Sequence, residues 1–149
     1  MRAVVQRVTD ADCTVENKIT GAIQKGFVVL LGVEEGDTED DCDYIARKVT
    51  QLRVFEDSDD KMNLALKDVN GSVLSVSQFT LLGDVRKGNR PSFTQAAQPE
   101  EAKRLYQVFN EKVRSQGIDV QEGIFQANML IRINNDGPVT ILLDSHKLF

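Results

Sequence analysis

Apolar residues in this chain recur at two different spacings, which predict strands in some segments and helices in others. Residues 2–8 (RAVVQRV) are rich in β-branched residues and predict a first strand, and residues 13–23 predict two short extended pieces around a polar turn at 16–18. Residues 27–33 (FVVLLGV) form a continuous apolar run, which is typical of a strand covered on both faces. We expect this strand at the centre of a sheet.

Two segments carry the three- and four-residue spacing of amphipathic helices. The first spans residues 37–52: Asp37 or Thr38 can cap it, and acidic residues fill its first turn, where the helix dipole favours them. The second begins near Pro99, and Gly117 closes it. The apolar stripes are Ile45, Val49 and Leu52 in the first helix and Ala102, Leu105, Phe109 and Val113 in the second.

The remaining segments predict further strands and one loop. Residues 52–57 are expected to be extended, residues 58–71 to form a loop, and residues 72–82 (SVLSVSQFTLL) to form a strong strand. Later strands are predicted with a hairpin-like connection at 135–138 between the last two; they are 118–123, 128–134 and 139–143. The sum is one α+β domain over residues 1–149, with a mostly antiparallel, strongly curved sheet or partial β-barrel and two main helices.

Length and composition fit a globular protein of the cytoplasm. At 149 residues the chain can bury roughly two-thirds of its unfolded surface, so it needs no disulfide or metal for stability. No apolar run approaches the roughly 20 residues that span a bilayer, and the first residues are too polar for a secretory signal. Cys13 and Cys42 have no CxxC spacing and are expected to be small semi-buried thiols. We therefore expect no membrane association.

The distribution of charge leaves one candidate site for phosphate. The chain has 18 basic and 23 acidic residues, a net charge of -5, which argues against a protein that coats nucleic acid with its whole surface. Residues 84–93 (DVRKGNRPSF) nevertheless carry Arg86, Lys87 and Arg90 with little acid. This loop is the best electrostatic candidate for meeting phosphate, and a merely solvated loop is the alternative.

Several kinds of catalytic chemistry lack their residues. The only histidine, His146, lies in the C-terminal tail, so a Ser-His-Asp unit or a multi-histidine zinc site is poorly supported. The glycine-rich nucleotide-binding motifs GxxxxGK(S/T) and GxGxxG do not occur, and residues 57–63 do not fit a calcium loop. We expect no metal and no cofactor. An enzyme with this sequence would use backbone dipoles, hydroxyls and amides, or a group of its substrate.

The segment SVSQFTL, residues 75–81, has two interpretations. Along a strand, Gln78 and Thr80 would share one face, and Ser77 and Phe79 the other. The strand could simply pass from core to surface, its hydroxyls satisfied by local hydrogen bonds. Alternatively, backbone N–H groups at the strand end could form an oxyanion hole beside the Thr80 hydroxyl or the Gln78 amide.

The local pattern of the segment NDGPVT, residues 135–140, is typical of a turn followed by a strand. Asp136 and Gly137 would make a turn, and Pro138 would begin a strand where no N–H donor is needed. A cis peptide bond before Pro138 is not favoured by pattern alone, because only about 5–6% of X-Pro bonds are cis.

The chain resembles the D-aminoacyl-tRNA deacylase family, whose members are also called D-tyrosyl-tRNA deacylases. The motifs that carry the resemblance cover almost the whole length: MRAVVQRV, VVLLGV, LRVFED, KMN, SVSQFTL, KGNRPSF and NDGPVTI. It implies an enzyme that hydrolyses the ester of D-aminoacyl-tRNA, and of glycine mischarged on tRNA, as chiral proofreading in translation. A non-catalytic module that binds RNA ends remains the alternative.

The resemblance also implies a homodimer in which two motifs meet across the subunits. The catalytic segment would be Ser77, Gln78, Phe79 and Thr80, with backbone donors at Phe79 and Thr80. A cis Gly137–Pro138 peptide of one subunit would enter the partner's site and reject L-aminoacyl groups by steric contact. Either Thr80 or the 2′-hydroxyl of the terminal adenosine would activate attack; the 2′-hydroxyl is favoured because no base for Thr80 is visible.

Further roles follow from the resemblance. Arg7 would support the Gly137–Pro138 loop, although a charge on a strand edge is the alternative. Phe125 and Met129 would lie near the terminal adenosine, although Phe125 could equally be a core residue. Gln126 and Asn128 depart from the small residue and acid that are more usual in the family, which leaves the rim of this site open. The basic residues Arg86, Lys87 and Arg90 would meet acceptor-stem phosphates.

Overall fold

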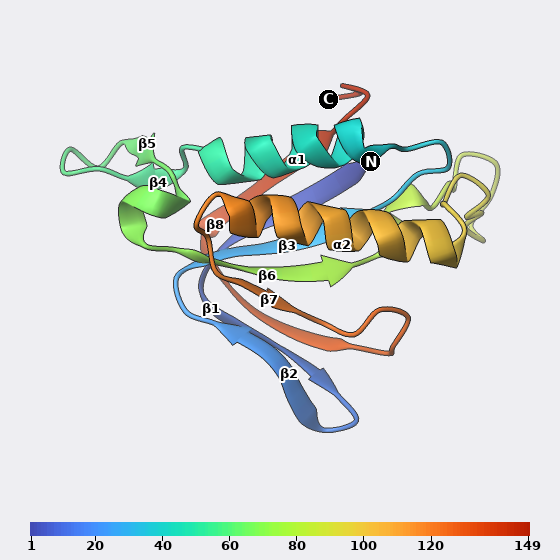
Figure 1. Ribbon diagram of the computed structural model, residues 1–149, viewed down its shortest axis with the longest axis horizontal. Helices are drawn as coiled ribbons and strands as arrows, with labels where there is room; N and C mark the ends of the chain where they lie inside the picture. Colours follow the sequence, from blue (N-terminus) through green and yellow to red (C-terminus); the bar gives the residue numbers. More distant parts are fainter.

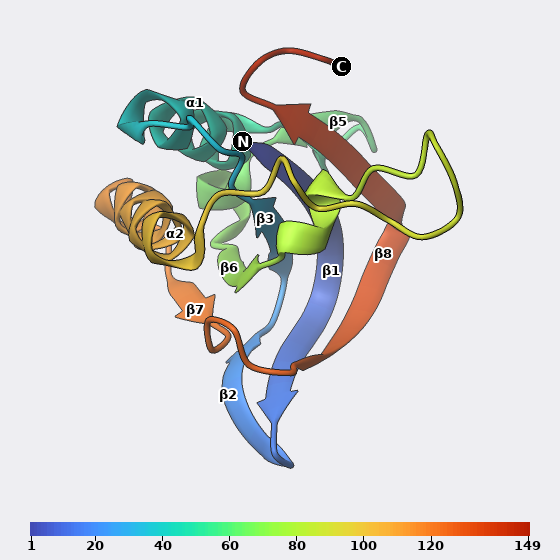
Figure 2. The same cartoon turned by 90° about the vertical axis from the view of Figure 1, so that its right-hand side faces the viewer.

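Two helices, α1 (Glu39–Gln51) and α2 (Pro99–Ser115), lie side by side on one face of a strongly curved sheet in the computed structural model, which describes residues 1–149 (Figures 1 and 2). The sheet has six strands: β1 (Arg2–Val15), β2 (Lys18–Ile23), β3 (Gly26–Gly32), β6 (Ser72–Ser77), β7 (Val120–Glu122) and β8 (Leu130–Asp144). The predicted α+β architecture, with a curved sheet and two main helices, is confirmed.

The long strand β1 organises the sheet. Its first half pairs antiparallel with β3, its second half pairs antiparallel with β2, and β8 pairs antiparallel along both halves. Strand β3 then pairs parallel with β6, and β6 pairs parallel with β7. β3 therefore lies inside the sheet, between β1 and β6, as its unbroken apolar run predicts.

The predicted hairpin near the C-terminus is wrong. Residues 130–144 form the single strand β8, and register shifts between Gln6 and Asp10 of β1 absorb the irregular step at 135–138. Both halves of β8 pack inward, because Ile131 and Ile133 contact the smaller core cluster and Val139 belongs to the larger one. Pro138 is tolerated because β8 is an edge strand, which pairs only with β1. The Gly137–Pro138 peptide bond is cis.

Two other predicted segments differ from the structure. The strand predicted over 72–82 ends at Ser77, and the chain then forms a 3-10 turn, η2 (Phe79–Leu82). This turn packs closely over the end of β3, where a Cβ at Gly32 would lie 2.7 Å from Leu82 Cδ2. The predicted loop at 58–71 contains β5 (Met62–Leu64), which pairs with β4 (Phe55–Glu56), and a second 3-10 turn, η1 (Leu66–Val69).

The helices begin as their sequences predict. Thr38 caps α1, and Asp41 completes the capping box by accepting from the Thr38 N–H over 2.8 Å. Pro99 occupies the first turn of α2, and Gly117 follows its end with φ +80°. Both apolar stripes lie in or against a core cluster of 23 residues, with Leu52 at its edge, so the helices are held by burial against the sheet. No helix is long and apolar enough to cross a membrane.

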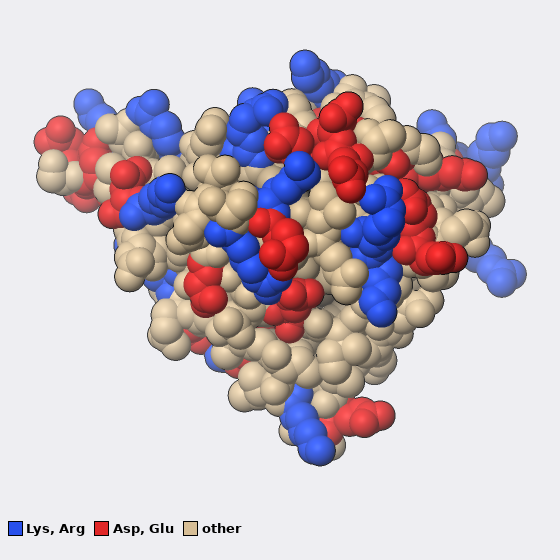
Figure 3. All heavy atoms as spheres, viewed as in Figure 1, with Lys and Arg blue, Asp and Glu red and all other residues tan.

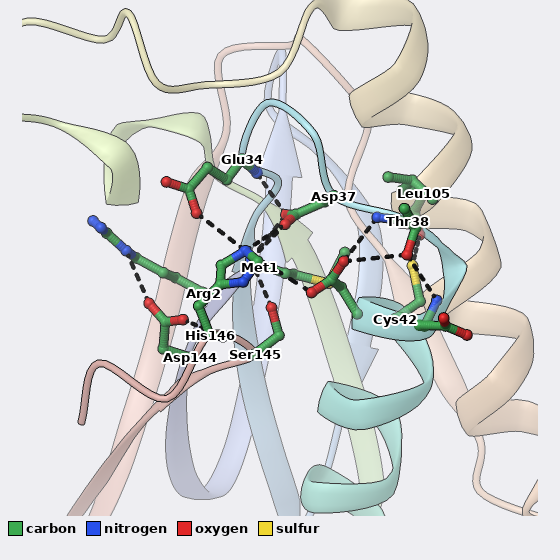
Figure 4. A network of polar contacts seen from close by, with 12 residues as sticks. Met1, Arg2, Glu34, Asp37, Thr38, Cys42, Leu105, Asp144, Ser145 and His146 are labelled. Atoms are coloured by element: carbon green, nitrogen blue, oxygen red, sulfur yellow. Dashed lines mark hydrogen bonds and ion pairs between the residues drawn. The ribbon is translucent and has the colours of Figure 1, made fainter.

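A polar network ties both chain ends to the start of α1 (Figure 4). The Met1 ammonium group lies 2.8 Å from an Asp37 carboxylate oxygen, and both groups are fully buried. The same ammonium donates to the Ser145 hydroxyl over 2.9 Å, and His146 Nε2 lies 3.1 Å from Asp37 Oδ1. The C-terminal tail is therefore fixed at His146.

Candidate active site

The polar residues of SVSQFTL lie where β6 ends and η2 begins. The Gln78 N–H donates to the Leu31 carbonyl over 2.8 Å, which extends the pairing of β6 with β3 by one residue. The next two N–H groups, of Phe79 and Thr80, open the 3-10 turn, where a helix leaves its first donors without intrahelical acceptors. Neither donates to a loop carbonyl or a side chain. Both can therefore donate to an oxygen atom of a ligand.

The side chains of this motif are partly open to solvent. Gln78 Nε2 donates to the Thr80 hydroxyl over 3.0 Å, so these two side chains meet although the strand that was expected to align them has ended. Phe79 is 56% exposed and stands edge-on to Phe93, with ring centroids 5.0 Å apart. Ser77, the last residue of β6, is half-buried. An exposed aromatic ring thus stands beside the two free N–H groups.

Arg2 holds the far end of η2. Its Nη1 donates to the Leu81 carbonyl over 3.1 Å, and its Nε donates to buried Asp144 over 3.3 Å. A groove of about 420 Å³ opens beside this contact, and Arg86 and Leu148 also line it. The open surface next to the motif is therefore polar and carries two arginines. Sequence reasoning missed Arg2, because its partners are 79 and 142 residues away.

Phe125 lies beside the helix residue Tyr106, whereas Met129 packs against a different core cluster. Tyr106 donates its hydroxyl to the Ser75 carbonyl in β6 over 2.8 Å, and its ring centroid lies 6.3 Å from that of Phe125. Phe125 is half-buried and packs against the larger core cluster. Met129 packs against the smaller cluster beside Gly123, where a Cβ would lie 2.5 Å from its sulfur. One aromatic side chain thus links Phe125 to the strand that carries Ser77.

Gln126 and Asn128 line the loop between these two residues. Both are exposed, and Gln126 has a positive φ of 65°. Their side chains make no hydrogen bond within the chain.

Gly137 and Pro138 are exposed on β8, and Arg7 lies directly behind them. Gly137 has φ +117°, and a Cβ at this position would lie 3.0 Å from Arg7 Nη2. Arg7 is 4% exposed, and its Nε donates to the carbonyl of Asp136 over 3.3 Å. The guanidinium therefore contacts the backbone immediately before Gly137.

The Gly137–Pro138 step and the Ser77–Thr80 segment do not meet within one chain. Gly137 lies level with Arg7 of β1, whereas Ser77 pairs with Leu31, which pairs with Ala3 of β1. Four residues of strand separate the two levels, roughly 13 Å, and β1 and β3 lie between β8 and β6. A second chain is needed if the two motifs act together.

The loop with the basic residues is exposed, but its charges are not equally free. Arg86 donates two hydrogen bonds to Asp84, at 2.9 and 2.7 Å, and this contact lowers the Asp84 pKa to about 2. Lys87 and Arg90 have no acidic partner. Acidic and basic side chains are interspersed on the face that carries the helices (Figure 3). Lys87 and Arg90 are therefore the freest cations of this loop.

One cluster could hold a cation, and sequence reasoning missed it. Ligand atoms of Glu34, Asp37 and His146 all lie within 4.8 Å of one another. However, Asp37 already pairs with the Met1 ammonium and accepts the Glu34 N–H over 2.7 Å. Glu34 and Asp37 are three residues apart, but His146 lies 109 residues beyond Asp37, so no local motif could reveal the cluster.

Comparisons with known proteins agree with the motifs. A family model described as D-Tyr-tRNA(Tyr) deacylase matches residues 4–144. Proteins named D-aminoacyl-tRNA deacylase are similar over the full length: that of Thermotoga petrophila is 58% identical over 149 residues and that of Koribacter versatilis 57%, with 100% of each chain covered.

Solved structures agree in fold. The c-Myc DNA Unwinding Element Binding Protein superposes with a TM-score of 0.91 at 42% identity, over 97% of this chain and 98% of that chain. A probable eukaryotic D-amino acid tRNA deacylase superposes with a TM-score of 0.79 at 19% identity, over 95% and 97%, which bears on the fold alone.

The fold and the strand-end site define a class of small α+β proteins whose candidate site offers backbone N–H, amide and hydroxyl groups. Within that class, the family match over 4–144 and the full-length relatives decide the assignment. The chain belongs to the D-Tyr-tRNA(Tyr) deacylase family.

Proposed function

We propose that this protein hydrolyses the ester bond of D-aminoacyl-tRNA, and of glycine mischarged on tRNA, and releases the free amino acid and tRNA. The observation that carries the proposal is the pair of unsatisfied N–H groups of Phe79 and Thr80 beside the Gln78–Thr80 contact, in a member of this family. Because charged tRNA would be the substrate, the activity belongs in the cytoplasm.

The two N–H groups would act as an oxyanion hole. Attack on the ester carbonyl turns its oxygen into an oxyanion, and donors already held in place stabilise that charge without reorganisation. Each such donor contributes on the order of 10²–10³-fold in known holes. Collapse of the intermediate breaks the bond to the 3′-oxygen of the ribose, which takes a proton, while water supplies the hydroxyl of the free acid.

The attacking water needs a group to accept or orient its proton. His146, the only histidine, lies 3.1 Å from Asp37 Oδ1 and makes no hydrogen bond to η2. The Thr80 hydroxyl accepts from Gln78 and has no basic partner. We therefore assign this task to the 2′-hydroxyl of the terminal adenosine, with Thr80 as a group that orients water. An aminoacyl ester is already activated, so this weak assistance suffices.

Selection against L-aminoacyl groups would come from the Gly137–Pro138 backbone of a second copy. Both residues are exposed, and their own Ser77–Thr80 segment lies too far away to use them. A backbone wall cannot rotate aside as a side chain can, and glycine permits the closest approach. An L side chain would collide with this wall, whereas a D side chain or a glycine would not.

The tRNA would be held at two places. Phe125 can stack on the terminal adenine, with Met129 beside it, because unpaired bases in RNA are commonly stacked on aromatic side chains. Lys87 and Arg90, and more weakly Arg86, would meet acceptor-stem phosphates, which position a substrate without reading its sequence.

The test separates hydrolysis from binding. D-tyrosyl-tRNA is incubated with the protein, and free D-tyrosine and bound tRNA are measured in the same samples. Release of D-tyrosine supports the enzyme, whereas tight binding without release supports a module that binds RNA ends. Thr80→Ala should keep substantial activity, and a substrate with a 2′-deoxy terminal adenosine should be turned over poorly; the reverse pair of results would assign the attack to Thr80.

A further inference from the structure

Glu56 lies on the other side of Arg7 from the Gly137 backbone. Both Glu56 carboxylate oxygens accept from Arg7 Nη1 at 2.9 Å, and the same nitrogen donates to the Val54 carbonyl over 2.6 Å. Glu56 belongs to β4, which pairs only with β5 in a separate two-stranded sheet. The contact therefore joins this small sheet to the centre of β1.

Arg7 divides its donors between two elements. Nη1 faces β4, whereas Nε contacts both the carbonyl of Asp136 at 3.3 Å and its carboxylate at 3.4 Å. Nη2 lies 3.0 Å from where a Gly137 Cβ would be. A planar guanidinium keeps these nitrogens in fixed relation, so anchoring one edge orients the other. Glu56 thus controls the edge that contacts Gly137 without touching Gly137 itself.

We propose that Glu56 is a positioning residue for chiral selection, which acts through Arg7 to fix the Gly137–Pro138 backbone. This inference rests on the proposed function of that backbone. Arg7 is buried, and without Glu56 its only carboxylate partner would be Asp136. Asp136 belongs to the same segment that Arg7 has to hold in place. Glu56 supplies a carboxylate from outside β8. The Arg7 hydrogen bond also lowers the pKa of Glu56, which favours the carboxylate form that Arg7 needs as an acceptor.

The test compares Glu56→Ala with wild type on D-tyrosyl-tRNA and L-tyrosyl-tRNA. The D/L ratio of the two kcat/KM values should fall about tenfold. A misplacement of about 1 Å can cost about 100-fold in rate, so a smaller shift of the Gly137–Pro138 backbone suffices for this effect. Glu56→Gln keeps one acceptor oxygen for Arg7 Nη1 and should restore most of the ratio. Glu101→Ala is the matched control, since Glu101 is 48% exposed beside Arg104, against 44% for Glu56 beside Arg7.

Hydrogen exchange gives a readout that does not depend on catalysis. Amides of residues 134–137 and 139 should exchange faster in Glu56→Ala than in wild type and should be unchanged in Glu101→Ala. Unchanged exchange and an unchanged D/L ratio in Glu56→Ala would overturn the role of Glu56. If wild type itself does not discriminate D from L, the proposed function fails, and faster exchange in Glu56→Ala would then show only that Glu56 fixes the segment.

Discussion

Arg7 Nη2 lies where it would contact a side chain at Gly137: a Cβ there would come within 3.0 Å of this nitrogen. The same Cβ would lie 2.9 Å from Val139 Cγ2, and Gly137 already has a φ of +117° that L residues rarely adopt. Space and backbone conformation both restrict this position to glycine.

Gly137→Ala should therefore damage both stability and activity. The strained backbone and the contact with Arg7 should lower the free energy of unfolding by about 1–3 kcal/mol, and hydrolysis of D-tyrosyl-tRNA should fall by about tenfold or more as the wall shifts. Thermal unfolding and kcat/KM measure the two effects. Gly36→Ala is the control, because Gly36 has φ +89° but nothing within 4 Å of the new Cβ; equal losses in both variants would deny a special role to Gly137.

The basic loop should contribute unequally to tRNA affinity. Replacing Lys87 or Arg90 by alanine should reduce the slope of log K against log salt by about 0.7–0.9, the value of one lost phosphate contact. Arg86→Ala should change the slope less, because Asp84 already neutralises Arg86. The dissociation constant of uncharged tRNA is measured from low to moderate salt. Arg104 lies on α2 and pairs with Glu101 and Glu39, so Arg104→Ala serves as control. If Arg104→Ala changes the slope as much as Lys87→Ala does, the loop has no special part in binding tRNA.

The buried pair of Met1 and Asp37 should matter for stability. Asp37→Asn leaves the Met1 ammonium buried without a negative partner, and breaking such a pair by removing one member costs about 3–5 kcal/mol. The unfolding midpoint in urea reports this loss. Asp43→Asn, which removes an exposed partner of Arg47, should change stability by less than about 1 kcal/mol. Similar midpoints for the two variants would show that the network in Figure 4 is not a buried ion pair in solution.

Cys42 should resist alkylation in the folded protein. Burial raises the pKa of its thiol to about 12, and its sulfur donates to the Leu105 carbonyl over 3.3 Å. The thiol pKa is higher in the folded than in the unfolded protein, so the neutral Cys42 thiol contributes to folding stability. This contribution is complete below about pH 8.5 and is lost as the pH rises towards 12. Peptide mapping after iodoacetamide treatment at pH 8.5 should find Cys42 modified only in denaturant; rapid modification of the native protein would contradict the burial.

Local patterns predicted those elements that local physics decides. The apolar run at 27–33 became the inner strand β3, and Thr38, Pro99 and Gly117 marked helix ends as expected. The hairpin at 135–138 was wrong, because turn residues were weighed without knowing that β1 runs to Val15 and can pair with both halves of β8. Strand β6 ends at Ser77 because η2 packs over Gly32 of β3, where a side chain would leave no room for it. The local sequence around Ser77 does not reveal this contact.

In the candidate site, too, local sequence identifies some features and misses others. The residues at 77–80 and 137–138 stand out in the sequence because each motif is contiguous. The contacts that hold them are not contiguous: Arg2 reaches Leu81 across 79 residues, and Arg7 reaches Glu56 across 49 and Asp136 across 129. Such partners have no spacing rule, so they can be assigned only once the fold is known.

The most direct measurement compares D-tyrosyl-tRNA and L-tyrosyl-tRNA, made from the same tRNA, under single-turnover conditions with wild-type protein. We predict that free D-tyrosine is released at least about 100-fold faster than L-tyrosine, which corresponds to about 2.8 kcal/mol of discrimination. Equal rates for the two substrates, or no release of either, would contradict chirally selective hydrolysis.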